Sequence, residues 1–284
     1  MDEIVKLREQ FQRAVCLEVI FLKDLKDGQT PSIADISNNL SRSLARSIIN
    51  VFGYPVSTDE IKAQTAGRNF ETAVRDYVQS AMKVLAHLRP ADWIYSVHSD
   101  ISEFVQYRHL ATLKELIKKN KDVHTALGDY VVTSDVLVAR NPVTDETINQ
   151  HNEIVNQQDI AYLTPLRQTN HQISTPILHA SISCKLTIRS DRSQNARTEG
   201  LNLIRNRKGH TPHIVVVTAE PMPTRIASLA LGTGDIDCVY HFALNELIQV
   251  AKDSENEAVQ DSLETMVVGG RLRDIADLPF DLVI

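Results

Sequence analysis

Apolar and polar residues alternate along the stretch from Ser181 to Arg189. Its apolar positions are Ile182, Cys184, Leu186 and Ile188, with polar residues between them. A period of two is typical of a half-buried β-strand, in which residues two apart share a face. The pattern therefore predicts a strand on which the polar residues from Ser183 to Arg189 share the face turned away from the core.

A helix is predicted directly after this strand. Ser193 is a suitable cap for a helix that begins near Gln194. Apolar residues then recur at helical spacing, and Glu199 lies at the edge of their stripe. Most often such a pattern marks a solvated strand edge followed by a surface turn. The alternative is an active site, in which the helix brings Glu199 back towards Lys185.

The rest of the chain divides into amphipathic and apolar segments. Helices are predicted over 2–26, from a cap at Ser37 or Asn38 to Gly53, and over 67–88, 105–119, 223–230 and 243–252. Strands are predicted over 93–97, 130–139, 213–219 and 237–242. Residues 144–175 are expected to form a long connection with a short helix near 159–166, and 271–284 an ordered tail. The order of elements indicates an α/β fold with helices on both sides of a mixed sheet.

Composition restricts the class of protein. With 284 residues and 43% hydrophobic side chains, the chain can form one large domain or two small ones. No apolar run approaches the length of a membrane span, and no signal peptide is visible at the start. The widely separated Cys16, Cys184 and Cys238 suit a reducing cytoplasm better than a disulfide framework, and no zinc-finger spacing is present.

The charge balance argues against a protein that binds nucleic acid through a broad basic surface. The net charge is −6, whereas phosphate groups are neutralised by Lys and Arg. A DNA-binding function would need its positive charge concentrated in a cleft. Such a concentration exists in Arg189, Arg192, Arg197, Arg205, Arg207 and Lys208.

Two carboxylates interrupt apolar patterns. Glu71 falls on the apolar face of the helix predicted over 67–88, where an unpaired carboxylate would cost several kcal/mol. Its head group either escapes to solvent or points into a polar site. Asp135 interrupts the strand predicted over 130–139. It is either an edge-strand aspartate or a ligand of a hard divalent cation, for which carboxylates are the natural ligands.

A resemblance decides between these alternatives. The residues that carry it are Ser183-Cys184-Lys185, Arg189-Ser190-Asp191-Arg192, Asn195-Ala196-Arg197, Glu199 and Asn206-Arg207-Lys208-Gly209. Together they resemble the NgoMIV family of type II restriction endonucleases, near-continuously from His179 to Leu244 and more loosely elsewhere. The resemblance implies the PD-(D/E)XK fold, with a central mixed sheet flanked by helices. We expect a single nuclease domain over 1–284, with a helical part up to about residue 90 and a catalytic α/β core from about residue 91.

The resemblance also implies the roles of the site residues in a Mg2+-dependent hydrolysis of phosphodiesters. Asp135 would be the main metal ligand, although Ser134 replaces the usual proline before it. The main-chain carbonyl of Cys184 would be a second ligand, and Lys185 would stabilise the scissile phosphate or position the attacking water. The usual acid two residues before the lysine is absent, because Ser183 stands there.

In the resembling subgroup, a glutamate of the following helix takes the place of that acid, and Glu199 is the matching residue. Glu71, within a Gly-Arg-Asn-Phe-Glu motif, would complete the side of the site that holds a second ion. The resemblance thus implies two Mg2+ ions in each active site.

Specificity is implied by a separate set of residues. Arg189, Asp191 and Arg192 match the major-groove contacts of the family, since arginine forks onto guanine and aspartate accepts from cytosine. Gln64 and Ser37 match minor-groove contacts. The implied target is the double-stranded sequence GCCGGC or a close relative, cut to leave a 5′ CCGG overhang.

A palindromic target implies a two-fold assembly. We expect a homodimer or a homotetramer in the cytoplasm of a bacterium, without a membrane partner. A DNA methyltransferase would be its functional partner and would not form a stable complex with it.

Two other functions share some of these features. A structure-specific repair nuclease or junction resolvase could use the same core, but it would not need the run from Arg189 to Arg192. A non-catalytic DNA-binding protein would tolerate the loss of Asp135 or Lys185, yet the full set of site residues is present.

Overall fold

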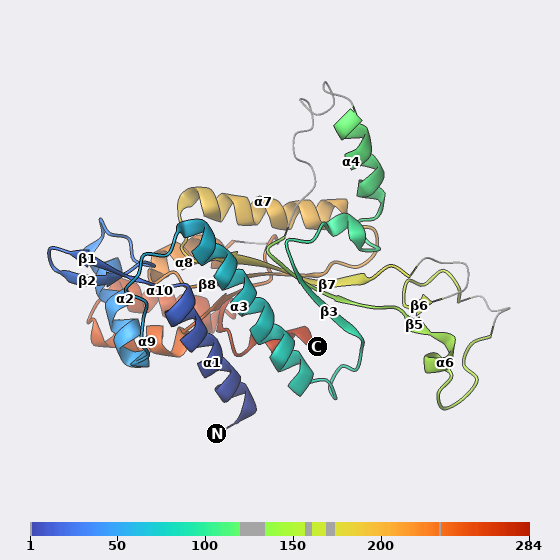
Figure 1. Cartoon of the computed structure of the whole chain (residues 1–284), viewed down its shortest axis with the longest axis horizontal. Helices are drawn as coiled ribbons and strands as arrows, with labels where there is room; N and C mark the ends of the chain where they lie inside the picture. Colours follow the sequence, from blue (N-terminus) through green and yellow to red (C-terminus); the bar gives the residue numbers. More distant parts are fainter. Residues whose placement is uncertain (1, 120–133, 157–160, 169–173, 233) are drawn as a thin grey trace.

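The computed structural model describes residues 2–119, 134–156, 161–168, 174–232 and 234–284. Within these residues, a six-stranded sheet has the order β10-β9-β8-β7-β4-β3 (Figure 1). The strands are β3 Trp93–Val97, β4 Val136–Arg140, β7 Ile177–Lys185, β8 His213–Thr218, β9 Cys238–His241 and β10 Leu272–Asp274. The strands from β7 to β10 run parallel, whereas β3, β4 and β7 are antiparallel neighbours. The predicted α/β class with a central mixed sheet is confirmed.

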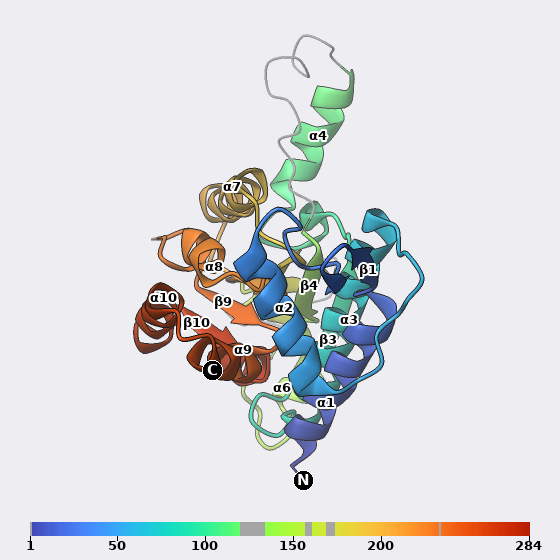
Figure 2. The same ribbon diagram turned by 90° about the vertical axis from the view of Figure 1, so that its left-hand side faces the viewer.

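Helices cover both sides of this sheet (Figures 1 and 2). Helix α3 packs on β3, β4 and β7, and α1 packs against α3. Helices α7, α8 and α10 lie on the opposite side. The helices are α1 Glu3–Glu18, α2 Asn39–Phe52, α3 Ala63–Val84, α4 His109–Lys119, α7 Ser190–Asn206, α8 Pro223–Ala230, α9 Leu244–Asp253, α10 Glu257–Val268 and α11 Leu278–Leu282, with a 3-10 turn at Ile101–Glu103. The buried apolar residues form one large cluster and a smaller second cluster, in which Tyr107 packs with Leu137 and Leu178.

Several elements follow their local sequence closely. The side chain of Asn38 accepts a hydrogen bond from the N–H of Ser41 and caps α2, and Gly53 ends the helix in the left-handed conformation. Strand β8 contains the apolar run from Ile214 to Val217, which is buried because β8 is a central parallel strand covered on both faces. The predictions for α2, β3, β8 and α8 are therefore confirmed.

The N-terminal helix is shorter than predicted. Helix α1 ends at Glu18, and the chain then forms a hairpin of β1 (Leu22–Leu25) and β2 (Gly28–Pro31). Gly28 has φ 107°, a value that favours glycine and that closes the tight turn after Asp27. Each strand of the hairpin is only 4 residues long, which is too short for its pattern to be distinguished from one more turn of helix.

The long connection after β4 also differs from the prediction. The described residues 161–166 are not helical, and 157–160 lie outside the description. The short helix is instead α6 (Asp145–Ile148), capped by Thr144, whose hydroxyl accepts from the N–H of Thr147. It lies between β5 (Val143–Thr144) and β6 (Arg167–Gln168), which pair in parallel. A long-range ion pair between Arg167 and Asp145 at 2.6 Å holds this arrangement, and such a contact leaves no periodic signal in the sequence.

Two further differences concern the ends of elements. Residues 130–133 of the predicted strand lie outside the description, and β4 begins at Val136. The apolar residues of the predicted C-terminal tail are expected to dock on the core. Leu272, Ile275 and Leu278 are buried, which confirms this, but Phe280 is 44% exposed. Helix α10 was not predicted.

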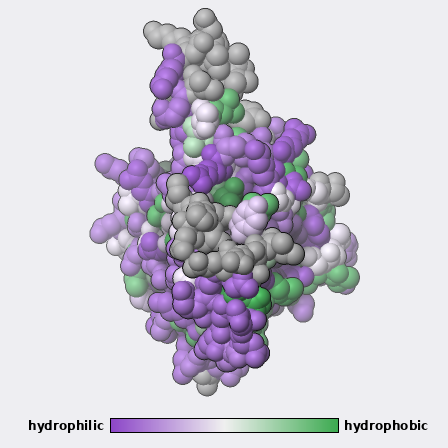
Figure 3. All heavy atoms as spheres, turned by 90° about the vertical axis from the view of Figure 1, so that its right-hand side faces the viewer, coloured by the Kyte–Doolittle hydropathy of each residue, from purple (hydrophilic) through white to green (hydrophobic). Residues whose placement is uncertain are grey.

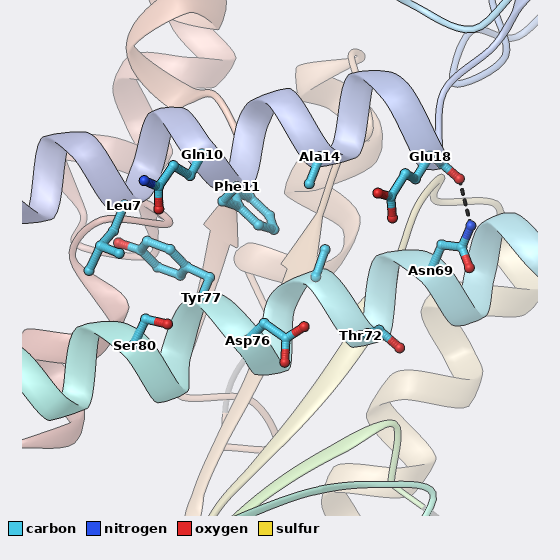
Figure 4. Close-up of a pocket in the computed structure, with 11 residues that line it drawn as sticks. Leu7, Gln10, Phe11, Ala14, Glu18, Asn69, Thr72, Asp76, Tyr77 and Ser80 are labelled. Carbon is cyan, nitrogen blue, oxygen red and sulfur yellow. Dashed lines mark hydrogen bonds between the residues drawn. The ribbon is translucent and has the colours of Figure 1, made fainter.

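Helices α1 and α3 enclose a groove of about 280 Å3 (Figure 4). Across it, the rings of Phe11 and Tyr77 lie 5.4 Å apart, and Asn69 donates a hydrogen bond of 2.7 Å to the carbonyl of Glu18. These contacts fix α3 against α1. Glu71 is not among the side chains that line the groove, so the contacts hold the helix while leaving that carboxylate free to face another part of the molecule.

Candidate active site

The pairing of β4 with β7 creates a cluster of polar side chains. Val136 lies opposite Ile182, so that Asp135, just before β4, comes beside the end of β7. Its Oδ2 atom accepts hydrogen bonds from the N–H of Cys184 at 2.7 Å and from Lys185 Nζ at 3.2 Å. Ser183 Oγ lies 3.4 Å from the same oxygen. One carboxylate oxygen is therefore the meeting point of the three residues at the end of the strand.

Helix α7 adds a second carboxylate. Glu199 Oε2 lies 3.2 Å from Ser183 Oγ and 3.9 Å from Lys185 Nζ. A hydroxyl has a single proton, so Ser183 donates to only one of the two carboxylates at a time. The structure thus brings together Asp135, Ser183, Lys185 and Glu199, as the sequence predicted; their catalytic roles remain a prediction.

The position of Glu199 next to the end of β7 is fixed by contacts of α7 with other elements. Its neighbour Gly200 is buried, and a Cβ atom there would lie 2.3 Å from the carbonyl oxygen of Asp235. Only glycine permits this approach of the helix. Arg197 forms an ion pair with Asp235 at 3.3 Å, and the hydroxyl of Tyr107 donates to the carbonyl of Leu203 at 2.9 Å.

Charge and burial compete at this cluster. Burial alone would lower the pKa of Lys185, but the negative charges of Asp135 and Glu199 outweigh it and raise that pKa. Burial also raises the pKa of Glu199, and Asp135 adds to the rise, while Lys185 opposes it. Two carboxylates and one ammonium group therefore share this partly buried cluster.

Glu71 approaches the cluster from α3. Its side chain is mostly buried, and burial followed by the charge of Asp135 raises its pKa, against the effect of His98. The Nε2 atom of His98 lies 2.7 Å from Glu71 Oε2. His98 was not predicted as a site residue. It has φ 55° directly after β3, and its N–H donates to the carbonyl of Asp135 at 3.2 Å.

The donors present suit a hard cation. Among the described residues, no three His, Cys, Asp or Glu side chains meet as a ready-made metal cluster. Mg2+ does not need one, because it usually binds one or two carboxylates, other oxygens, water and substrate phosphates. Asp135 and Glu199 lie within 3.2 and 3.9 Å of the one ammonium group of Lys185. The charge of Asp135 also acts on the nearby Glu71, so a bound cation would offset the repulsion between these carboxylates. The thiol of Cys184 is buried, and burial raises its pKa well above its ordinary value, which leaves main-chain atoms to contribute at this position.

A cleft of about 440 Å3 adjoins the cluster. The side chains that line it and matter for chemistry are Lys23, Glu60, Lys185, Arg189, Asn195 and Glu199. Lys23 belongs to the hairpin β1–β2 and was missed because that segment was predicted to be helical. The cleft places positive charge beside the carboxylate cluster, although the whole chain is acidic.

The predicted DNA contacts lie in three segments. Arg189 is exposed and precedes α7, which begins at Ser190 and not near Gln194. The predicted cap Ser193 lies inside the helix and is 6% exposed, because its side chain packs towards α8. The side chains of Asp191 and Arg192, in the first turn of α7, lie outside the description.

The strand is also shorter than the alternation indicated. Strand β7 ends at Lys185, so Thr187 and Arg189 belong to the connection before α7 and do not share the strand face with Ser183.

The two predicted minor-groove residues are exposed. Gln64 lies in the first turn of α3, between Ala63 and Ala66, which line the cleft. Ser37 precedes α2, and its hydroxyl donates to Asp35 Oδ1 at 2.7 Å. Ser37 does not line the cleft in the part of the chain that is described.

Within the same residues, no helix is both long and apolar enough to cross a membrane.

Comparisons with known proteins gave matches to a family model, to a curated protein and to a solved structure. The family model described as the NgoMIV restriction enzyme matches residues 11–284. The type II restriction enzyme NgoMIV of Neisseria gonorrhoeae is 47% identical over 279 residues, which cover 93% of this chain and 96% of that protein. A solved complex of the restriction endonuclease PspGI with its substrate DNA is 12% identical, covers 100% of this chain and 92% of that chain, and has a TM-score of 0.31. At that TM-score the likeness to PspGI carries no argument.

Proposed function

The chain belongs to the NgoMIV restriction enzyme family, and we propose that it cuts double-stranded DNA at GCCGGC or a closely related GC-rich palindrome. As a type II restriction endonuclease it is a site-specific deoxyribonuclease. The observation that carries the finer proposal is the meeting of Asp135, Ser183, Lys185 and Glu199 beside a cleft that contains Arg189. Cleavage before the central CCGG of each strand would leave a 5′ CCGG overhang.

The proposed cofactor is Mg2+, with two ions in each active site. Asp135 and the carbonyl of Cys184 would hold the first ion, Glu199 would take the place of the missing acid, and Glu71 would complete the side of the second ion. When bound, Mg2+ neutralises charge that develops on the phosphate and lowers the pKa of an attacking water. The approach of Glu71 and Glu199 to Asp135, with the pKa of both glutamates raised chiefly by burial, supports this assignment.

The residues of the chain supply orientation and charge. Lys185 carries a positive charge at neutral pH because Asp135 and Glu199 raise its pKa, so that its ammonium group can stabilise an anionic phosphate or position water next to it. Ser183 lies between the two carboxylates and donates its one hydroxyl proton to either of them. In this proposal Glu199 performs from a helix the task that an acid on the strand performs elsewhere in the superfamily.

Base recognition is proposed for Arg189, Asp191 and Arg192 in the major groove and for Gln64 and Ser37 in the minor groove. Recognition of a palindrome needs two copies of the chain, so we infer a homodimer or a homotetramer. The segment between β5 and β6 exposes the apolar side chains of Ile154, Tyr162, Leu163 and Leu166, which supports self-association. Figure 3 shows some hydrophobic surface, in green, on the mostly hydrophilic face at that end of the molecule.

The proposed setting is the cytoplasm of a bacterium that also contains a DNA methyltransferase for the same site. That enzyme would protect the host DNA and would not form a stable complex with this chain.

Digestion of a plasmid of known sequence in Mg2+, followed by mapping of the ends, tests the proposal. We expect cuts at GCCGGC with 5′ CCGG overhangs, and no cuts in a plasmid that lacks the site. A structure-specific nuclease of the same superfamily would instead cut branched DNA and ignore the palindrome. Cuts at unrelated sequences would contradict the proposed target while leaving the nuclease activity intact.

A further inference from the structure

The ends of strands β7 and β8 are tied together beyond their ladder. Lys185 lies opposite Thr218, whose hydroxyl donates a hydrogen bond of 2.7 Å to the carbonyl of Lys185. The N–H of Glu220 in turn donates to the hydroxyl of Thr218 at 3.1 Å. The catalytic strand therefore ends against the segment that follows β8, and the first fixed point is the main chain of Lys185 itself.

Glu220 supplies the second fixed point. Its side chain is 0% exposed. Oε2 accepts a hydrogen bond of 2.8 Å from the N–H of Ile188, and Oε1 accepts one of 3.1 Å from the N–H of Met222. Ile188 directly precedes Arg189, so the short connection between Lys185 and α7 is held at both of its ends.

The same carboxylate lies next to a second segment of interest. Glu220 Oε2 is 3.9 Å from Arg225 NH1, and Arg225 forms an ion pair with Asp35. Asp35 accepts hydrogen bonds from the hydroxyl of Ser37 at 2.7 Å and from its N–H at 3.0 Å. A continuous chain of polar contacts therefore leads from the segment with Ser37 to the connection with Arg189, and Glu220 is its buried centre.

A carboxylate without solvent contact destabilises the fold unless its oxygens accept hydrogen bonds or pair with a positive charge. Burial raises the pKa of Glu220 to about 7, although its two backbone hydrogen bonds oppose the rise. An apolar side chain of similar size would fill the same volume without that cost, but it could not accept from Ile188 and Met222.

We propose that Glu220 is a positioning residue that fixes the DNA-reading connection at Arg189 relative to Lys185, and so couples recognition of the bases to placement of the scissile phosphate. The inference rests on the proposed function, in which the segment from Arg189 to Arg192 contacts bases. Glu220 itself touches neither DNA nor metal in this proposal. Its effect passes through the main chain of Ile188.

Hydrogen exchange in the free protein tests, without DNA, whether Glu220 holds the connection between Lys185 and α7. Three variants are compared with the wild type: Glu220→Ala, the isosteric Glu220→Gln, and Asp274→Asn as a control for lost stability. Asp274 is also buried and also accepts a backbone hydrogen bond, from the N–H of Leu244, but it lies at β10. We expect exchange of the Ile188 amide to accelerate about tenfold or more in Glu220→Ala and less in Glu220→Gln, and to stay unchanged in Asp274→Asn.

Binding in Ca2+ tests the consequence for recognition. Each variant is titrated with a GCCGGC duplex, with a duplex altered at one G·C pair, and with random DNA. In Glu220→Ala the preference for GCCGGC over the altered duplex should fall about tenfold, the worth of a good base contact, while affinity for random DNA stays within about twofold. Glu220→Gln should recover part of the preference, because its amide oxygen still accepts one backbone hydrogen bond.

Two results would overturn the proposal. If both Glu220 variants melt earlier, as Asp274→Asn does, but keep the full preference for GCCGGC, the residue is only structural. If the wild type prefers no duplex, the proposed function fails and the coupling fails with it. The exchange of Ile188 would still show whether Glu220 holds the connection, so the two failures are distinguishable.

Discussion

At the scale of single residues, Asp135 is the natural first test of the site, because Cys184, Lys185 and Ser183 all approach one of its oxygens. Asp135→Ala should abolish cleavage in Mg2+ but leave preferential binding of GCCGGC in Ca2+, since the predicted base contacts are untouched. Cleavage assays and gel shifts on the same preparation measure both. Cleavage above a few per cent of the wild-type rate would remove Asp135 from the catalytic set.

Substitution of Glu199 tests whether a carboxylate on α7 performs the role of the acid that is missing two residues before Lys185, where Ser183 stands. Glu199→Ala should lower the cleavage rate by orders of magnitude, because it removes a carboxylate from a site built for cations. Ser183→Glu in that background should restore part of the rate, since Ser183 Oγ lies 3.2 Å from the carboxylate that was lost. Single-turnover rates at saturating Mg2+ measure both effects. Normal cleavage by Glu199→Ala would show that α7 is only scaffolding here.

Glu220 should make stability depend on pH. Glutamate in an unfolded chain has a pKa of about 4.3, whereas burial raises the pKa of Glu220 in the fold to about 7. Below the lower value the group is protonated in both states and has no effect. As the pH rises between the two values the unfolded chain ionises first, so the free energy of unfolding falls.

Glu220→Gln removes this titration. Between pH 5 and pH 8, its free energy of unfolding should therefore fall by about 2–3 kcal/mol less than that of the wild type. Urea unfolding at several pH values measures the difference. Parallel pH profiles of the two proteins would show that the carboxyl group is ionised in the fold as easily as in water.

The residues most accessible to sequence reasoning are those with a local signature. Asp135 and Glu71 interrupt apolar patterns, and Lys185 stands in an alternating strand, so the local pattern makes each of them a candidate, and the family resemblance then favours the functional alternative. His98 and Glu220 have no such signature. Their positions become special only through a contact distant in the sequence, with Glu71 and with Ile188 respectively.

At the scale of elements, the prediction succeeded where the signal was local and failed where pairing decided. Helix α2 has its cap and its terminal glycine in the sequence, and β8 has a continuous apolar run. The hairpin β1–β2 and the pairing of β5 with β6 arise from contacts between segments, which a helical period cannot reveal. The early start of α7 has a similar cause, since Ser193 packs towards α8 and does not serve as a cap.

Substitutions in α7 and just after it should distinguish base contacts from contacts with the DNA backbone. Arg192→Ala, in its first turn, should weaken binding of GCCGGC far more than binding of random DNA, because each bidentate guanine contact is worth about 1–3 kcal/mol of discrimination. Lys208, which is exposed just after the helix, should behave differently. Its loss should weaken binding to all duplexes alike and reduce the salt dependence by about one unit per contact.

Gel shifts in Ca2+ at several salt concentrations, with cognate, singly altered and random duplexes, distinguish these two patterns. Equal weakening of all three duplexes by Arg192→Ala would make it a backbone contact.

At the scale of the whole molecule, Arg8 joins the first helix to the far end of the sheet. Its guanidinium contacts Asp274 with two hydrogen bonds of 2.7 Å, and Glu246 with bonds of 2.8 and 2.6 Å. All three side chains are largely buried. Because α1 also packs against α3, which carries Glu71, this contact connects the end of the chain with the placement of a candidate site residue.

Breaking a buried ion pair leaves charges without a partner, so Arg8→Ala should lower the free energy of unfolding by about 3–5 kcal/mol. The matched control is Arg75→Ala, which removes a partly exposed ion pair with Asp76 on α3 and should cost less than about 1 kcal/mol. Urea denaturation measures both, and cleavage assays below the unfolding transition show whether a loosened α1 also disturbs the site. If the two variants lose the same stability, the buried network around Arg8 contributes no more than a surface ion pair. In that case α1 would be held by its apolar face alone.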